Sequence, residues 1–333
     1  MKRILIILIA IFFFLGKENK AQDMQYTQLY AASIYLNPAF TGANVCSRFT
    51  LTYRNQWPGI TTAYKSYMLS MDHYIVNKNL GLGLIAAHDV SGTGILSTDY
   101  FHPVFAYQTN ISRKTTLRLG IQPGLTNKSI NIANSLFGDQ IVRGGNVATI
   151  ETVPQSKMFF DAGAGALIYS ANYWVGSSFY HLNKPNESLV PGVSSKLPIK
   201  YCVQGGAKFS LAEDEKTNYN DNRITLAFNY KGQGKFDQFD IGFYLKEHIL
   251  NLGIWYRGLP GFKSYKAGYP NNDAVAFIIG IETDRMNFGY SHDLTISSLK
   301  TVSKGANELT ISYQFCKLKK KKRRTVTVSC PKF

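Results

Sequence analysis

Apolar and polar side chains alternate along short segments of this chain from Ser47 onward. Near the C-terminus, Leu309, Ile311, Tyr313 and Phe315 interleave with polar residues, and segments 222–231 and 114–126 repeat the pattern. A period of two places successive side chains on opposite faces of a strand, so each segment has one apolar face. Segments of about ten residues with this pattern are typical of strands in membrane barrels.

The alternation predicts fourteen antiparallel strands. We place them at residues 47–56, 62–75, 80–90, 95–110, 114–126, 157–170, 172–180, 199–210, 222–231, 236–246, 248–256, 273–283, 285–292 and 305–315. An even number suits a closed up-and-down barrel with both termini on one side. The predicted fold class is therefore all-β, a 14-stranded antiparallel transmembrane β-barrel of the outer membrane.

The connections between these strands sort by length. Short ones fall at 76–79, 112–113, 171, 247 and 284, and long ones at 127–156, 181–198, 257–272 and 293–304. Bacterial barrels have short periplasmic turns and longer outer loops, so the short connections are assigned to the periplasm. Segment 211–221 would be a long periplasmic exception. The competing fold is a soluble, secreted propeller or sandwich, although no repeat of 40–50 residues supports the propeller.

The two ends of the chain differ in composition from the barrel. Lys2 and Arg3 precede an apolar run over residues 4–16, which predicts a cleaved signal peptide at 1–21 and an exported protein. We divide the rest into a periplasmic N-terminal segment at 22–46, the barrel at 47–315 and a basic periplasmic tail at 316–333.

Composition supports a membrane location. Aromatic residues make up 14% of the chain and charged residues 17%, against roughly 25% charged residues in soluble domains. No segment after residue 21 is apolar for long enough to form a membrane-spanning helix, which leaves a lipid-facing barrel. The net charge of +16 could suggest nucleic acid, but no nucleic-acid-binding motif accompanies it, so no such partner is expected.

Candidate chemistry is sparse, and we expect no enzyme, cofactor or metal site. Ser291, His292 and Asp293 are adjacent in a predicted strand, where their side chains alternate between faces and cannot form a catalytic relay. The six histidines are scattered without zinc-ligand spacing. Charged residues within the predicted strands should face the lumen or lie near a rim, because a charge facing lipid is costly; they are Lys65, Asp72, Arg118, Asp240 and Arg257.

Four cysteines in an exported protein can form disulfides. Cys46 precedes the first predicted strand and Cys316 follows the last. These strands must be neighbours if the barrel closes, so Cys46 and Cys316 are predicted to lie close together and could join the seam. Pairing of Cys316 with Cys330 is the alternative, and Cys202 is expected to remain a free thiol.

Several short motifs, in order over nearly the whole mature chain, resemble the PorP/SprF membrane proteins of the type IX secretion system. They begin with Gln25-Tyr26 and the run from Tyr35 to Gly42, and continue with Tyr53-Arg54-Asn55-Gln56-Trp57-Pro58. The pattern residues are Asn37, Pro38, Ala39, Gly42, Tyr53, Arg54, Asn55, Gln56, Trp57, Asp72, Asp89, Gly92 and Asp293. His292 stands where an aromatic residue is expected.

The resemblance implies a function in protein secretion. Such family members are outer-membrane barrels that work with periplasmic and peptidoglycan-associated components to deliver or anchor cell-surface proteins, including gliding adhesins. The basic run Lys319, Lys320, Lys321, Lys322, Arg323 and Arg324 could dock to an acidic periplasmic partner or touch anionic head groups. The alternative function is an outer-membrane channel for small or hydrophobic solutes.

Overall fold

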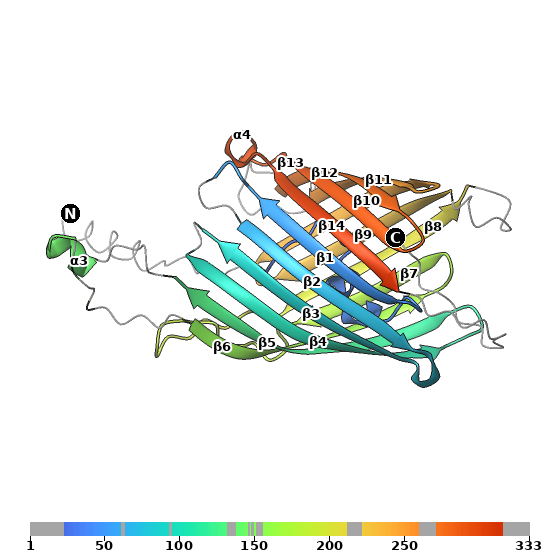
Figure 1. Ribbon diagram of the computed structural model, residues 1–333, viewed down its shortest axis with the longest axis horizontal. Coiled ribbons are helices and arrows are strands. Elements are labelled where there is room, and N and C mark those ends of the chain that lie inside the picture. The colour runs from blue at the N-terminus through green and yellow to red at the C-terminus, as the bar shows by residue number, and fades with distance from the viewer. Residues whose placement is uncertain are drawn as a thin grey trace, which may run out of the picture.

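A computed structural model describes residues 23–60, 64–92, 95–131, 138–145, 147, 150, 156–211, 222–259 and 271–315. Fourteen antiparallel strands form one closed barrel in which each strand pairs with its neighbours in sequence and β14 pairs with β1 (Figure 1). The strands are β1 (Ser47–Gln56), β2 (Tyr64–Ile75), β3 (Leu80–Ser91), β4 (Leu96–Asn110), β5 (Thr116–Ile130), β6 (Ser156–Tyr169), β7 (Tyr173–Tyr180), β8 (Lys200–Ser210), β9 (Arg223–Gln233), β10 (Phe236–Glu247), β11 (Leu250–Leu259), β12 (Asn271–Glu282), β13 (Met286–Thr295) and β14 (Ala306–Phe315).

The predicted 14-stranded barrel is confirmed, and the strands begin and end within a few residues of the expected positions. The seam pairs β1 with β14 along their whole length, from Ser47 opposite Phe315 to Gln56 opposite Ala306. The alternation of side chains is also observed. Large apolar residues such as Leu51, Leu119 and Ile279 are exposed on the outer face, where lipid would cover them.

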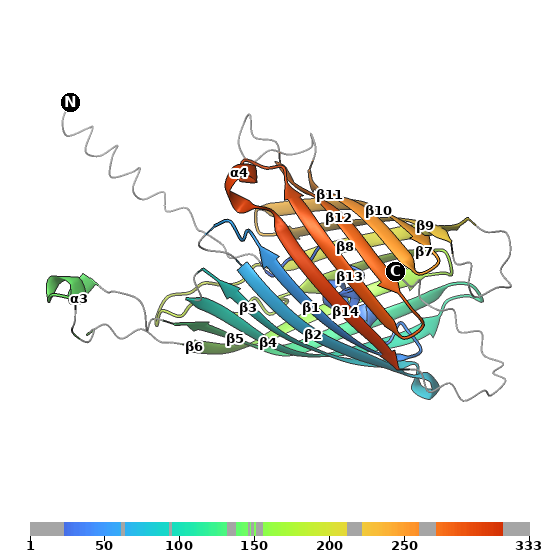
Figure 2. The same cartoon turned by 45° about the horizontal axis from the view of Figure 1, so that its top comes forward.

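The connections assign the two ends of the barrel. Turns 76–79, 111–115, 170–172, 248–249 and 283–285 are short and lie at one end, together with the start of β1 and the end of β14. The strand ends of β8 and β9 that connection 211–222 joins also lie at this end, so this connection is the long exception. The strand ends joined by the longer connections 131–155, 181–199, 260–270 and 296–305 lie at the other end, where Figure 2 shows α4 (Lys300–Ser303). We therefore assign the first end to the periplasm and the second to the cell exterior.

The segment before β1 lies inside the lumen, which differs from the periplasmic location expected for residues 22–46. The described part of this segment contains the short helix α2 (Ser33–Leu36) and the 3₁₀ turn η1 (Pro38–Phe40), drawn in dark blue inside the barrel (Figures 1 and 2). Most of its side chains are buried, and they form the core together with residues from the surrounding strands. We call residues 23–45 the plug.

The width of the barrel accounts for the difference, because it leaves room for a chain segment in the lumen. Strand side chains alone fill a barrel of about eight strands, and wider barrels hold channels or plugs. Here the inner face carries polar and charged residues that need partners, and the plug supplies them. The predicted signal peptide at 1–21 and basic tail at 316–333 lie outside the described residues. Within the described part, no helix is long and apolar enough to cross a membrane.

Candidate functional site

The plug contacts the barrel wall most closely at glycines of the strands. A Cβ atom at Gly120 would lie 2.4 Å from the backbone of Pro38 and Ala39, and one at Gly165 would lie 2.0 Å from Oδ1 of Asn37. Glycine inside a strand commonly marks a position where another backbone approaches closely. The wall is thus shaped to receive the turn of the plug.

The turn itself is held by Asn37, whose side chain is fully buried. Its Oδ1 accepts a hydrogen bond from the Ala39 N–H at 2.8 Å, which caps η1. Its Nδ2 donates to the carbonyls of Ala166 and Ser177, both at 3.0 Å. One side chain therefore defines the turn and fastens it to β6 and β7. Pro38 at the first position suits the turn because its φ is already fixed.

Three wall residues, Asp72, Arg48 and Arg118, hold the part of the plug nearest the periplasm. The Gly42 N–H donates to Oδ2 of Asp72 at 2.9 Å, and Gly42 has a φ of 67°, which favours glycine. Arg48 pairs with the other oxygen of Asp72 at 3.0 Å and donates to Ser33 of the plug at 2.8 Å. Arg118 is fully buried on β5 and donates to the carbonyls of Ala39 and Thr41.

A cluster of charges near the outer ends of β1, β11, β13 and β14 binds the plug at Thr27. The Thr27 hydroxyl accepts hydrogen bonds from Arg54 at 2.7 Å and Arg257 at 2.9 Å, and donates to Asp293. Arg54 also pairs with Asp293 at 2.7 Å and with Glu308 at 3.0 Å. Glu308 accepts the backbone N–H groups of Thr27 and of the residue that follows it. All of these charges are buried, so each depends on the others for compensation.

Aromatic side chains fill the centre of the lumen. The Tyr30 ring of the plug lies edge-on to Trp174 of β7, with centroids 5.5 Å apart, and 6.0 Å from Trp255 of β11. All three are buried. Tyr30 therefore contacts two strands, β7 and β11, that are not neighbours in the barrel wall. Aromatic contacts of this kind add to the packing energy beyond the burial of apolar surface alone.

The outer end of the plug is fixed by Asp23. Its carboxylate pairs with His181 and Lys200, each at 3.0 Å. Burial raises the pKa of Asp23, but Lys200 and His181 outweigh this effect and hold the pKa well below 3.8. Burial lowers the pKa of His181, and the carboxylates of Asp23 and Asp161 reverse this and raise it to about 10. His181 is therefore charged at neutral pH.

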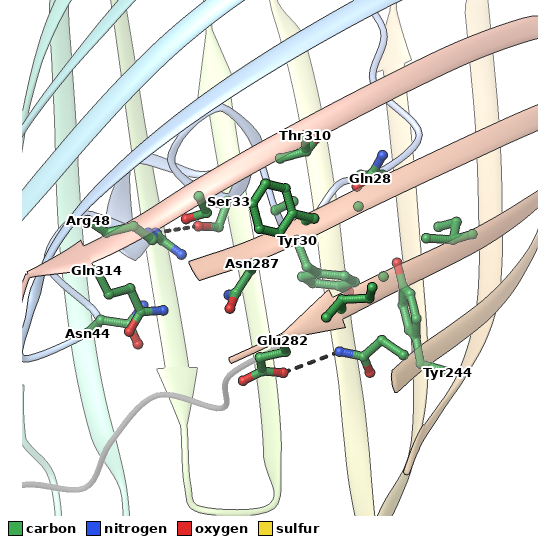
Figure 3. Close-up of a pocket in the computed structure, with 18 of the residues that line it drawn as sticks. Gln28, Tyr30, Ser33, Asn44, Arg48, Tyr244, Glu282, Asn287, Thr310 and Gln314 are labelled. Carbon is green, nitrogen blue, oxygen red and sulfur yellow. Dashed lines mark hydrogen bonds between the residues drawn. The ribbon is translucent and has the colours of Figure 1, made fainter. Parts of the chain in front are cut away.

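Cavities remain on both sides of the plug. Toward the periplasm, a cavity of about 110 Å³ lies between the plug and strands β10 to β14. Figure 3 shows Arg48 reaching Ser33 on one side of this cavity and Glu282 at its margin. Toward the exterior, two cavities of about 440 Å³ each share the walls formed by Asp23, Gln25 and Trp57.

The structure brings several sequence-predicted residues together. Asn37, Pro38, Ala39 and Gly42 form the turn that Asp72 holds. Arg54 meets Asp293 in the charge cluster. Gln56, Trp57 and Asp89 line an outer cavity. By strand alternation Tyr53 and Asn55 lie on the opposite face from Arg54, and Gly92 follows β3 with a φ of 66°.

The structure does not bring the other predicted residues together in one site. Ser291 and Asp293 are buried in the lumen, whereas His292 bonds to Asn307, so the three do not form a relay. The described residues contain no group of three or more that could hold a metal ion. Of the strand charges, Asp72, Arg118, Asp240 and Arg257 are buried in the lumen and Lys65 is exposed at the outer end of β2.

The cysteines and the basic tail remain partly outside the described residues. Cys46 is disulfide-bonded, and Cys202 is a buried free thiol. Cys316 and Cys330, and the basic run from Lys319 to Arg324, lie outside the described residues.

A family model described as "Type IX secretion system membrane protein PorP/SprF" matches residues 18–313. The chain belongs to the PorP/SprF family. It is therefore a type IX secretion system membrane protein, and its β-barrel fold and family assign it to the outer membrane. A comparison with curated protein sequences finds no match.

Solved structures resemble this PorP/SprF barrel in fold. The toluene transporter TbuX of Ralstonia pickettii matches with a TM-score of 0.50 and 10% identity, covering 85% of this chain and 93% of that one. A mutant of the TodX monoaromatic hydrocarbon channel matches with a TM-score of 0.48 and 12% identity, covering 85% and 94%. At such identity the likeness to TbuX concerns the fold alone.

Sequence reasoning missed Thr27, Tyr30 and Glu308 as functional contacts in this PorP/SprF protein. Thr27 and Tyr30 lie in the segment predicted to be periplasmic, and Glu308 is one of the polar residues that alternate with apolar ones near the C-terminus. The sequence nevertheless contained a sign of these contacts. Arg54, Asp293 and Glu308 occupy lumen-facing positions and require compensation, which indicates a common partner inside the barrel.

Proposed function

We propose that this barrel delivers or anchors cell-surface proteins, such as adhesins that can serve gliding motility, in the outer membrane. Its membership of the PorP/SprF family supports a place in type IX secretion. The observation that carries the proposal is the plug, because Tyr30 and Thr27 lie inside the lumen and are held there by buried contacts with the wall. A barrel filled in this way suits a fixed anchor better than a wide conduit.

The partners in this proposal are the secreted surface protein outside and peptidoglycan-associated secretion components in the periplasm. The run from Lys319 to Arg324 carries six consecutive positive charges and follows β14, whose end lies on the periplasmic side in our assignment. Such a run attracts acidic surfaces, and we propose that it docks to an acidic periplasmic partner. No catalytic step is part of this function.

Deletion of the gene followed by surface proteomics tests the proposal. We expect one or a few surface proteins to disappear from the cell surface and to return when the full chain is supplied. A truncation before Lys317 serves as the matched variant for the tail. It should leave the barrel in the outer membrane and abolish co-purification of the periplasmic components. An unchanged surface proteome after deletion would refute the anchoring function, and retained co-purification would refute the docking role alone.

The second candidate function is a channel for small or hydrophobic solutes. The observation that favours it is the presence of cavities on both sides of the plug. Conductance or solute flux through the purified protein in planar bilayers distinguishes the two functions. The anchor function predicts that the intact chain gives no stable conductance, and a steady open channel with the plug in place would favour the solute channel.

A further inference from the structure

One of the two outer cavities combines carboxylates with aromatic rings. This cavity, of about 440 Å³, lies between the plug and the outer ends of β1 to β6. Its aromatic walls are Trp57, Tyr64, Tyr100 and Phe159. Its carboxylates are Asp23, Asp89, Asp161 and Glu187, which outnumber the basic residues Lys128 and His181. We call it the Asp89 cavity.

Most of these carboxylates already have cationic partners. Asp23 pairs with Lys200, Asp161 pairs with His181 at 2.9 Å, and Glu187 pairs with Lys128 at 2.6 Å. Because burial makes an unpaired charge costly, these pairs account for three of the four carboxylates.

Asp89 differs from the other three. In the part of the chain that the structure describes, its carboxylate accepts one hydrogen bond, from the buried hydroxyl of Ser66 to Oδ1 at 2.5 Å, and forms no ion pair. Asp89 lies opposite Thr98, in the third residue pair from the outer end of the β3–β4 ladder, and its residue is only partly exposed. A negative charge at the wall of a cavity is thus left for a ligand to neutralise.

The surrounding rings determine which cation fits. Aromatic faces attract organic cations through the ring quadrupole, most strongly for Trp and Tyr. A divalent metal ion would need several oxygen ligands together, and the described residues contain no such group. The geometry therefore points to a group that is both cationic and partly apolar.

We propose that the Asp89 cavity binds the guanidinium or ammonium group of an organic cation that enters from the cell exterior. Asp89 would supply the countercharge, and Trp57, Tyr64 and Tyr100 would enclose the apolar part. The group could belong to a free cation or to a basic side chain of a polypeptide. This binding is independent of the proposed anchoring function, since it requires only the purified barrel.

Binding can be measured with the full chain in detergent. N-acetyl-Gly-Arg-Gly amide is the peptide probe, L-argininamide is the free probe, and N-acetyl-Gly-citrulline-Gly amide is a control of similar shape that carries no charge. Calorimetry gives the affinity, and Trp57 fluorescence reports occupancy of the cavity. Trp174 and Trp255 are buried around Tyr30, so Trp57→Phe should remove the ligand-dependent fluorescence change.

Asp89→Asn keeps the shape of the side chain and removes its charge. It should weaken binding of the arginine probe by about tenfold or more, the range for a hydrogen bond to a charged group. Asp99→Asn is the matched control, because Asp99 lies on the next strand, is exposed and pairs with His88. It should bind like the unmodified protein. Heat-modifiable gel mobility verifies that both variants are folded.

Two results would overturn the proposal. One is equal binding of the citrulline and arginine peptides, and the other is unchanged affinity in Asp89→Asn. Binding of L-argininamide as tight as that of the peptide would support a free cation as the ligand, whereas binding of the peptide alone would support a basic side chain of a polypeptide.

Discussion

Arg54 on β1 and Asp293 on β13 form a 2.7 Å ion pair across the intervening strand β14, although they are 239 residues apart in sequence. Both side chains are buried, and Thr27 of the plug bonds to both. The pair therefore joins the barrel seam to the plug.

Arg54→Met should destabilise the barrel strongly, because it leaves Glu308 without a cation and Asp293 with Arg257 alone. Removing one partner of a buried pair costs about 3–5 kcal/mol. The midpoint temperature of heat-modifiable gel mobility measures the effect. Lys65→Met, at an exposed position of β2, is the control and should change the midpoint little. Equal midpoints for the two variants would show that the cluster does not hold the plug.

Gly120→Ala should loosen the plug from the wall, because the added Cβ would lie 2.4 Å from backbone atoms that cannot rotate away. Overpacking of this kind typically costs about 1–3 kcal/mol. Gly280→Ala is the matched control, since Gly280 also lines the lumen and a Cβ there meets its nearest atom at 3.2 Å. Limited proteolysis of the plug should be faster in Gly120→Ala than in Gly280→Ala. The reverse order would contradict the described packing.

The contact between Asp23 and His181 should depend on pH. The pKa of His181 is raised from 6.5 to about 10, so its contribution to stability is complete below 6.5 and declines as pH rises to 10. The pKa of Asp23 is lowered from 3.8, so its contribution is complete above 3.8 and is lost as pH falls further. The contact should thus stabilise the protein most between pH 3.8 and 6.5.

His181→Gln should remove the alkaline part of this dependence. Thermal midpoints measured from pH 5 to 10 should show the largest difference from the unmodified protein at the acid end of that range. His248→Asn, in the exposed turn at the opposite end of the barrel, is the control. A constant difference across the range would indicate that His181 acts without its charge.

The direction of the plug predicts from which side of the outer membrane a reagent can reach each end of the plug. Gln25 lines the outer cavities and Asn44 lines the periplasmic one. In intact cells, a membrane-impermeant maleimide should label Gln25→Cys, whereas Asn44→Cys should react only after the outer membrane is permeabilised. Both variants also carry Cys330→Ser, because the predicted pairing of Cys46 with Cys316 leaves Cys330 free to react. Cys202 is buried and contributes little background. Labelling of Asn44→Cys alone in intact cells would reverse our assignment of the ends.

The disulfide at Cys46 should connect to Cys316. Ser47 lies opposite Phe315 in the β1–β14 pair, so the residues next to them in sequence are the natural partners. Peptide mapping without reduction should find the Cys46 to Cys316 link, and Cys316→Ser should free the Cys46 thiol whereas Cys330→Ser should not. Loss of the bond should lower stability by about 2–4 kcal/mol. A link from Cys46 to Cys330 would refute the predicted pairing.

The strands could be predicted from sequence because the alternation of apolar and polar side chains involves only residues that are adjacent in the chain. Each pair of adjacent residues, such as Leu309 and Thr310 on β14, reports which face is apolar without reference to any distant segment. The seam followed from the even number of strands. Local pattern was therefore sufficient for the architecture.

The plug could not be placed by the same reasoning. Its position depends on pairings over long distances in sequence, such as Asn37 with Ser177 and Thr27 with Glu308. Neither its short helix nor its turn has a pattern long enough to indicate a burial partner. The inward-facing glycines of the strands, such as Gly120 and Gly165, were the available signal, since they leave room that a second backbone must fill.

The charge cluster around Thr27 also bears on assembly of the barrel. Its members come from β1, β11, β13, β14 and the plug, so the binding site for Thr27 is complete only when the first and last strands have met. Closure of the barrel and seating of the plug therefore depend on each other, since the contacts of Thr27 span the seam between β1 and β14.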